Sequence, residues 1–142
     1  MRGDETTIAG AIDSNVLLSI LLGDPGDQAE AGYTLLQRLA AEHKRLRVYP
    51  LVVAEIVFVL ERQYKADRAT VAVDVSSLME HAALAVEQEP LVLEALALYG
   101  RHNVPFGDAL IAIAMQGEGM AEIFSWDPHF ERVPGLVRRR PE

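Results

Sequence analysis

The pattern that decides the fold of this chain opens with the stretch Ile8-Ala9-Gly10-Ala11-Ile12-Asp13-Ser14-Asn15. The apolar run over 8–12 predicts a short buried strand. The polar residues that follow are common helix N-caps, so a helix is expected through Leu22. Short apolar runs and helical stretches alternate in this way to the end of the chain. Strands separated by helices favour a mainly parallel sheet with helices on its faces.

The remaining elements follow from the spacing of apolar residues, from caps and from breakers. We expect further helices over 28–43, 50–64, 68–80, 90–100 and from 105 or 107 to 117, and further strands over 47–49, 84–86, 122–125 and 137–139. No linker, repeat or low-complexity segment interrupts the series. The sequence therefore predicts an α/β protein, an α/β/α sandwich with a mainly parallel central sheet, as a single domain over residues 1–142.

Composition limits the function classes. Half of the 142 residues are hydrophobic, which allows a real core, and the absence of cysteine excludes a disulfide framework. No apolar run approaches the roughly 20 residues of a membrane-spanning helix, and no targeting signal is visible. We expect a soluble, cytoplasmic protein that does not enter membranes. The net charge of -8 argues against a general nucleic-acid coat but leaves a nuclease open.

Four acidic residues adjoin or interrupt apolar runs, where carboxylates are costly unless something offsets their charge. They are Asp13, Glu55, Asp108 and Asp127. With no cysteine and four scattered histidines, the expected partner is a hard divalent cation held by oxygen ligands. Ligands of open parallel sheets bind beyond the carboxyl ends of the strands, where Asp13 and Asp127 are predicted to lie. We therefore expect the four to form a metal-dependent active site.

Each acidic residue also has an ordinary structural interpretation. Asp13 and Asp108 stand where helix caps are common, and Asp127 before a proline suits a turn. Glu55 resists this explanation best, because its neighbours three and four positions away along the helix are all apolar. These neighbours, which predict that its side of the helix is covered, are Leu51, Val52, Phe58 and Val59.

The blocks that carry these acids resemble the PIN-domain nucleases, and among them the VapC-type toxins of bacterial toxin–antitoxin pairs. The resemblance covers nearly the whole chain, in the right order and spacing. Its four blocks run from Ile12 to Leu18, from Val53 to Arg62, from Val104 to Ala112 and from Ile123 to Phe130. One such block would be weak evidence, whereas four ordered blocks are strong.

The resemblance implies an α/β/α fold that cleaves RNA with Mg²⁺ or Mn²⁺. Asp13, Glu55 and Asp108 match the core carboxylates of the family and Asp127 matches a more variable fourth one. Asn15 and Ser125 match polar positions that orient the others, and Ser125 stands where threonine is commoner. The resemblance also implies RNA as substrate, a protein antitoxin as partner, and a homodimer.

Two other classes of function remain open from the residues. The first is a phosphatase or phosphoacceptor, which also places an aspartate after a strand. A phosphatase of the haloacid-dehalogenase type requires a second aspartate at the position of Asn15. A receiver domain requires a lysine late in the chain, whereas the last lysine here is Lys65. The second class is a binding module without catalysis.

Basic residues near one helix end and near the carboxyl end of the chain are the candidates for binding RNA phosphates. They are Arg38, Lys44, Arg45, Arg47, Arg132 and Arg138 to Arg140. The histidines are interpreted as surface or packing residues.

Overall fold

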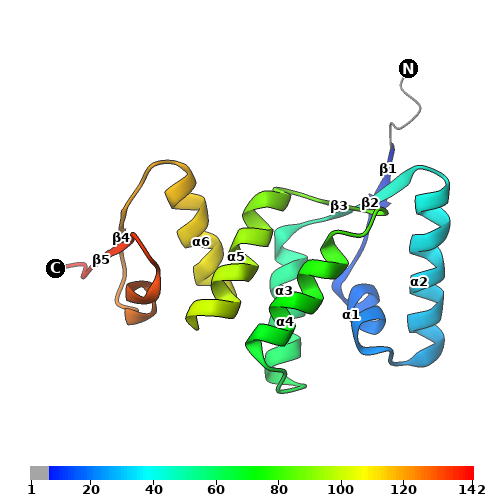
Figure 1. Ribbon diagram of the computed structural model, residues 1–142, viewed down its shortest axis with the longest axis horizontal. Coiled ribbons are helices and arrows are strands. Elements are labelled where there is room, and N and C mark those ends of the chain that lie inside the picture. Colours follow the sequence, from blue (N-terminus) through cyan, green and yellow to red (C-terminus); the bar gives the residue numbers. More distant parts are fainter. Residues whose placement is uncertain (1–6) are drawn as a thin grey trace.

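The predicted succession of helices and strands is confirmed by a computed structural model, which describes residues 7–142 (Figure 1). The strand expected at 47–49 is longer and earlier, because it begins at Lys44 and ends at Val48. The elements are β1 (Thr7–Ala11), α1 (Ser14–Leu22), α2 (Gly26–Ala41), β2 (Lys44–Val48), α3 (Pro50–Arg62), α4 (Arg68–Met79), β3 (Leu84–Val86), α5 (Glu89–His102), α6 (Phe106–Gly117), β4 (Glu122–Phe124), the short 3₁₀ helix η1 (Pro128–Arg132) and β5 (Val137–Arg139).

Local chemistry sets several helix ends. Asp13 caps α1, and its Oδ1 accepts the Ser14 backbone N–H at 2.7 Å. The helix stops at Gly23, whose φ of 66° is a left-handed conformation that suits glycine. Asp67 caps α4 by accepting the Thr70 backbone N–H, three residues on, at 3.3 Å. Pro50 opens α3, where its missing N–H costs nothing. The caps that the sequence predicted are therefore present.

The strands form two sheets rather than the single sheet that the sequence predicted. One has the order β1-β2-β3 and the other pairs β4 with β5, and every pairing is parallel. The two edge strands of the larger sheet differ, since all residues of β3 are buried and all residues of β1 are exposed. The expectation of a buried strand over 8–12 was therefore wrong except at Ile12, because within residues 7–142 only β2 pairs with β1.

The core lies between the larger sheet and the helices, and α3 contributes the face that carries Val53, Ile56 and Val57. Glu55 points elsewhere and is exposed. Leu51 and Phe58, which were expected to be covered, are 72% and 59% exposed. The predicted burial of the Glu55 side of α3 was wrong, because both sides of this helix are apolar and the other one packs against the core.

Figure 1 shows the two sheets on opposite sides of α5 and α6, which lie side by side. The start of α6 is anchored on α5 by buried Val104 and Phe106, and the rings of Tyr99 and Phe106 meet edge to face at 6.2 Å. This places α6 next to β4, η1 and β5, and away from β1. No helix within residues 7–142 is long and apolar enough to cross a membrane.

Candidate metal centre

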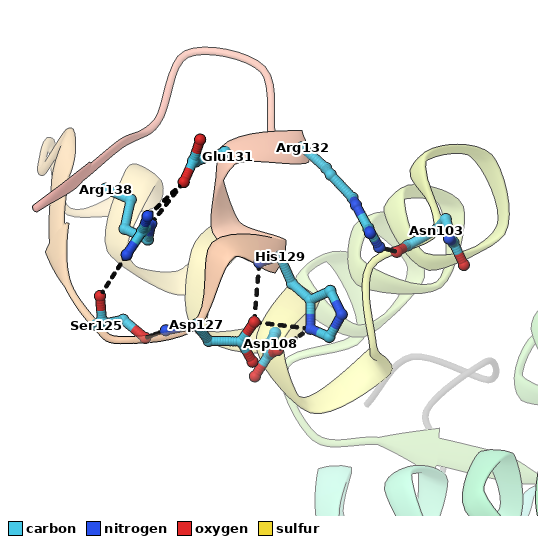
Figure 2. A network of polar contacts seen from close by, with 8 residues as sticks. All are labelled: Asn103, Asp108, Ser125, Asp127, His129, Glu131, Arg132 and Arg138. Carbon is cyan, nitrogen blue, oxygen red and sulfur yellow. Dashed lines mark hydrogen bonds and ion pairs between the residues drawn. The ribbon is translucent and has the colours of Figure 1, made fainter. Parts of the chain in front are cut away.

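The start of α6 and the loop after β4 bring Asp108, Asp127 and His129 together, and we call these three residues the Asp108 cluster (Figure 2). Each offers one ligand atom, and the three atoms lie within 4.8 Å of one another. Asp108 lies in the first turn of α6, where unpaired backbone N–H groups and the helix dipole favour negative charge. Two of the four predicted acids therefore share one site.

The loop after β4 holds Asp127 through two successive hydrogen bonds. Ser125 Oγ accepts the Asp127 backbone N–H at 2.9 Å, and Asp127 Oδ1 accepts the His129 backbone N–H at 2.8 Å. The second contact makes Asp127 the N-cap of η1. Ser125 therefore fixes the backbone of the loop that carries Asp127. Its role in orienting a metal-binding cluster stays a prediction.

Local environment moves the pKa values of the two carboxyl groups in opposite directions. Burial raises the pKa of Asp108, the negative charge of Asp127 raises it further, and His129 partly offsets both effects. The His129 backbone N–H, which stabilises the ionised form, lowers the pKa of Asp127, and the His129 side chain adds to this effect. The surroundings therefore favour the ionised form of Asp127 and disfavour the ionised form of Asp108.

His129 is the site residue that the sequence interpretation missed. Its Nδ1 lies 2.8 Å from Asp127 Oδ1 and 4.0 Å from Asp108 Oδ2, so it is not merely a surface or packing residue. Nδ1 is shielded from solvent and has no hydrogen bond of acceptable geometry. The available signal was the spacing Asp127-Pro128-His129, because a 3₁₀ turn after the capping aspartate returns the side chain two residues later towards the cap.

The structure does not bring the other predicted site residues into the Asp108 cluster. Asp13 is exposed after β1, and Asn15 is exposed in the first turn of α1. Glu55 is exposed on α3, but its neighbours Ala54 and Phe58 line a cleft of about 450 Å³ together with the first residues of α6. α3 therefore adjoins the start of α6 through Ala54 and Phe58, whereas Asp13 follows β1 of the larger sheet.

Two arginines, Arg132 and Arg138, form hydrogen bonds that hold the segments around the cluster in place (Figure 2). Arg138 of β5 donates to Glu131 Oε2 at 2.7 Å and to the Ser125 carbonyl oxygen at 3.1 Å. Arg132 donates to the Asn103 carbonyl oxygen at 2.7 Å, which ties η1 to the segment before α6. These contacts join the two segments that carry Asp108 and Asp127, so the spacing of the cluster is held from both sides.

The donor set fits a divalent cation. Two carboxylates and one imidazole offer oxygen and nitrogen ligands from positions that surrounding hydrogen bonds already orient. His129 Nδ1 faces both carboxylates, at 2.8 Å from Asp127 Oδ1 and 4.0 Å from Asp108 Oδ2, and imidazole nitrogens are common metal ligands. A positive ion would also offset the charge that burial and Asp127 make costly on Asp108.

Comparison with known proteins decides the family. The family model described as "PIN domain" matches residues 11–136, which include the three residues of the Asp108 cluster. The chain belongs to the PIN-domain family. It is also similar to a protein named VapC ribonuclease from Aquifex aeolicus (strain VF5), with 27% identity over 122 residues, or 86% of this chain and 90% of that protein. The PIN-domain assignment confirms the predicted family and the α/β/α sandwich class.

Removal of the Ser125 hydroxyl tests how this PIN domain orients Asp127. In Ser125→Ala the Asp127 backbone N–H loses its acceptor, and we expect the free energy of unfolding to fall by about 1 kcal/mol. Ser125→Thr keeps the hydroxyl and is the matched control. Urea denaturation of the three proteins measures the difference, and equal losses in both variants would mean that the hydroxyl contact contributes nothing.

Proposed function

We propose that this PIN-domain protein is a divalent-metal-dependent endoribonuclease and the toxin of a toxin–antitoxin pair. The observation that carries the proposal is the Asp108 cluster, in which two carboxylates and an imidazole converge at a helix N-terminus. The similarity to a protein named VapC ribonuclease supports RNA as the substrate and a protein antitoxin as a partner. We further propose that the protein acts in the cytoplasm, where cellular RNA lies.

In this proposal the residues of the chain bind the ion and position it. The three residues of the Asp108 cluster bind the ion from one side. We propose that Asp13 and Glu55 supply further carboxylate ligands, and that Asn15 orients Asp13. When bound, a divalent ion lowers the pKa of a water molecule and neutralises charge on a scissile phosphate, so no side-chain nucleophile is needed. Asp127, whose pKa the His129 backbone N–H lowers, remains an ionised acceptor at neutral pH.

The imidazole bears on the choice of ion. The sequence predicted Mg²⁺ or Mn²⁺, and Mg²⁺ prefers oxygen ligands in a near-ideal octahedron. A site with one nitrogen donor is better suited to a transition metal, so we propose Mn²⁺ as the ion that binds more tightly at the Asp108 cluster.

The experiment that tests the function uses the purified protein and a mixture of structured RNAs. RNA cleavage is expected with Mn²⁺ or Mg²⁺. It is expected to stop in excess EDTA and to return when the metal is restored, because the carboxylates alone cannot activate water. Products are expected to carry 5′-phosphates. Cleavage that persists in EDTA would contradict metal dependence, and intact RNA under every metal condition would favour a binding module that lacks catalysis.

Replacement of His129 tests the third ligand without measuring activity. We expect His129→Ala to weaken Mn²⁺ binding at least about tenfold, since even a partner that only orients a ligand contributes about that much. His102, an exposed residue near the end of α5, provides the control variant His102→Ala. Isothermal titration calorimetry measures the affinities, and unchanged Mn²⁺ binding in His129→Ala would remove the imidazole from the ligand set.

A further inference from the structure

The larger sheet ends in an edge that is unusual for a protein surface. All five residues of β1 are exposed, yet the strand, Thr7-Ile8-Ala9-Gly10-Ala11, contains no charge and no proline. Exposed edges normally carry such residues because they stop another strand from pairing there. Ile8 is 42% exposed on this edge. Apart from the irregularity between Ile8 and Gly10 in its pairing with β2, β1 is therefore suited to a further strand.

The smaller sheet presents the complementary edge. β4 pairs with β5 on one side only, and Phe124 at its end is 68% exposed. Two of the three residues of β4, Ile123 and Phe124, are apolar, and the charge of Glu122 is paired with Arg139 of β5. β5 carries two arginines in its three residues, which protects the outer edge of this sheet from pairing. Of the two free edges of the small sheet, that of β4 matches β1.

Parallel pairing of β4 with β1 would also join the separated acids. Asp13 follows the carboxyl end of β1, and Asp127 follows the carboxyl end of β4. The carboxyl ends of parallel strands lie at the same side of a sheet, so this pairing places the Asp108 cluster beside Asp13. The gap between β1 and β4, which divides the strands into two sheets, therefore also separates Asp13 from the Asp108 cluster.

The same chain cannot supply β4 while α6 keeps its place. Buried Val104 and Phe106 anchor the start of α6 on α5, and Gln116 near its end donates to the Pro134 carbonyl oxygen at 3.0 Å. Four residues, 118–121, connect α6 to β4. Figure 1 shows β4 and β1 on opposite sides of α5 and α6. The small sheet is therefore held away from its own β1.

We propose that β4 of one copy pairs with β1 of a second copy, and that each copy both gives and receives a strand. Such an exchange is closed and two-fold symmetric, so neither edge remains free. Each acidic site then takes Asp13 and Glu55 from one chain and the Asp108 cluster from the other. The shared site rests on the proposed function, whereas the strand pairing does not.

Cross-linking tests the pairing without any assay of activity. The chain has no cysteine, so Ala9→Cys in β1 and Glu122→Cys in β4 introduce the only thiols. Both positions are exposed, and a bismaleimide of about 10 Å covers two strand spacings, which tolerates an unknown register. The double variant is expected to give a covalent dimer in denaturing gels. Neither single variant is expected to do so above the background of chance collisions.

The other outcomes of cross-linking overturn the pairing. A link within one chain, identified by mass spectrometry of the monomer band, would show that the chain closes its own sheet. The absence of any link between the two positions would show that β4 does not pair with β1. Circular dichroism of the variants confirms that they are folded, and light scattering of the unmodified protein must show a dimer, since a monomer at micromolar concentration contradicts the proposal.

Complementation tests the shared site with two inactive chains. Asp13→Asn and Asp108→Asn are unfolded together and refolded as a mixture. Half of the symmetric dimers then contain one chain of each, and one of their two sites has both acids, so about a quarter of the unmodified activity is expected. Mixing without unfolding is the control and is expected to remain inactive. If the refolded mixture cleaves RNA no faster than either variant alone, the two chains do not share a site.

These results separate the two proposals. If the unmodified protein cleaves no RNA, the proposed function fails, while the covalent dimer still decides the pairing. If the protein cleaves RNA and the double variant links within its own chain, the function stands and the exchange of strands is wrong.

Discussion

Asp108→Asn is expected to lower RNA cleavage by at least about 100-fold, because the loss of a residue that merely orients a metal ligand already costs up to that factor. The amide keeps the volume of the side chain and removes the charge that binds the ion. Asp74→Asn, which neutralises an exposed aspartate on α4, is the matched control and is expected to leave cleavage unchanged. Initial cleavage rates at saturating Mn²⁺ measure the effect. An Asp108→Asn variant with full activity would mean that Asp108 only begins a helix.

Thermal melts of the same variants provide an independent readout. Because burial and Asp127 raise the pKa of Asp108, the folded protein holds this proton more tightly than the unfolded chain does. The stability linked to that proton is present at low pH and is lost as the pH rises through the pKa of the folded state. In EDTA at neutral pH, Asp108→Asn is therefore expected to melt no lower than the unmodified protein.

Metal should reverse that order. Mn²⁺ is expected to raise the melting temperature of the unmodified protein and of Asp74→Asn much more than that of Asp108→Asn, since binding to the folded state stabilises it. Equal metal-induced shifts in all three proteins would remove Asp108 from the site.

Phe106→Ala is expected to lower the free energy of unfolding by about 3–5 kcal/mol, the usual cost of removing a buried phenylalanine ring. Phe106 is almost completely buried, and its ring meets Tyr99 of α5 edge to face. Ile111 lies exposed on the same helix, so Ile111→Ala is the control and is expected to change stability by about 0.5 kcal/mol or less. Urea denaturation compares the two. A small loss in Phe106→Ala would show that α6 is not anchored on α5 through this ring.

The elements of the fold could be predicted because their signals are local. Asp13 and Asp67 are caps whose hydrogen bonds form within one turn, and Gly23 ends α1 through its own backbone conformation. The apolar runs of β3 and β4 carry no information about what lies beside them. Whether one sheet or two results depends on the packing of α6 against α5, which is a contact between helices that the spacing within a strand does not encode.

The candidate site could be predicted only in part for the same reason. Asp108 and Asp127 each stand at the start of a helix, and that position is visible in the sequence. Glu55 was expected to be covered because its neighbours are apolar, but α3 is apolar on more than one side and only the structure shows which side faces the core. His129 was missed although it stands only two residues after Asp127, because the 3₁₀ turn that brings its side chain back towards Asp127 was not predicted.

The arginines at the end of the chain are already engaged with other parts of the protein. Arg138 binds Glu131 and the Ser125 carbonyl, Arg139 pairs with Glu122 at 2.8 Å, and Arg140 lies over the ring of Trp126. A protein that neutralises few phosphates releases few counterions from a nucleic acid, so its affinity changes little with salt concentration. Under the proposed function, a chain of net charge -8 is expected to discriminate among RNAs by the shape and exposed bases of the target strand rather than by the density of its phosphates.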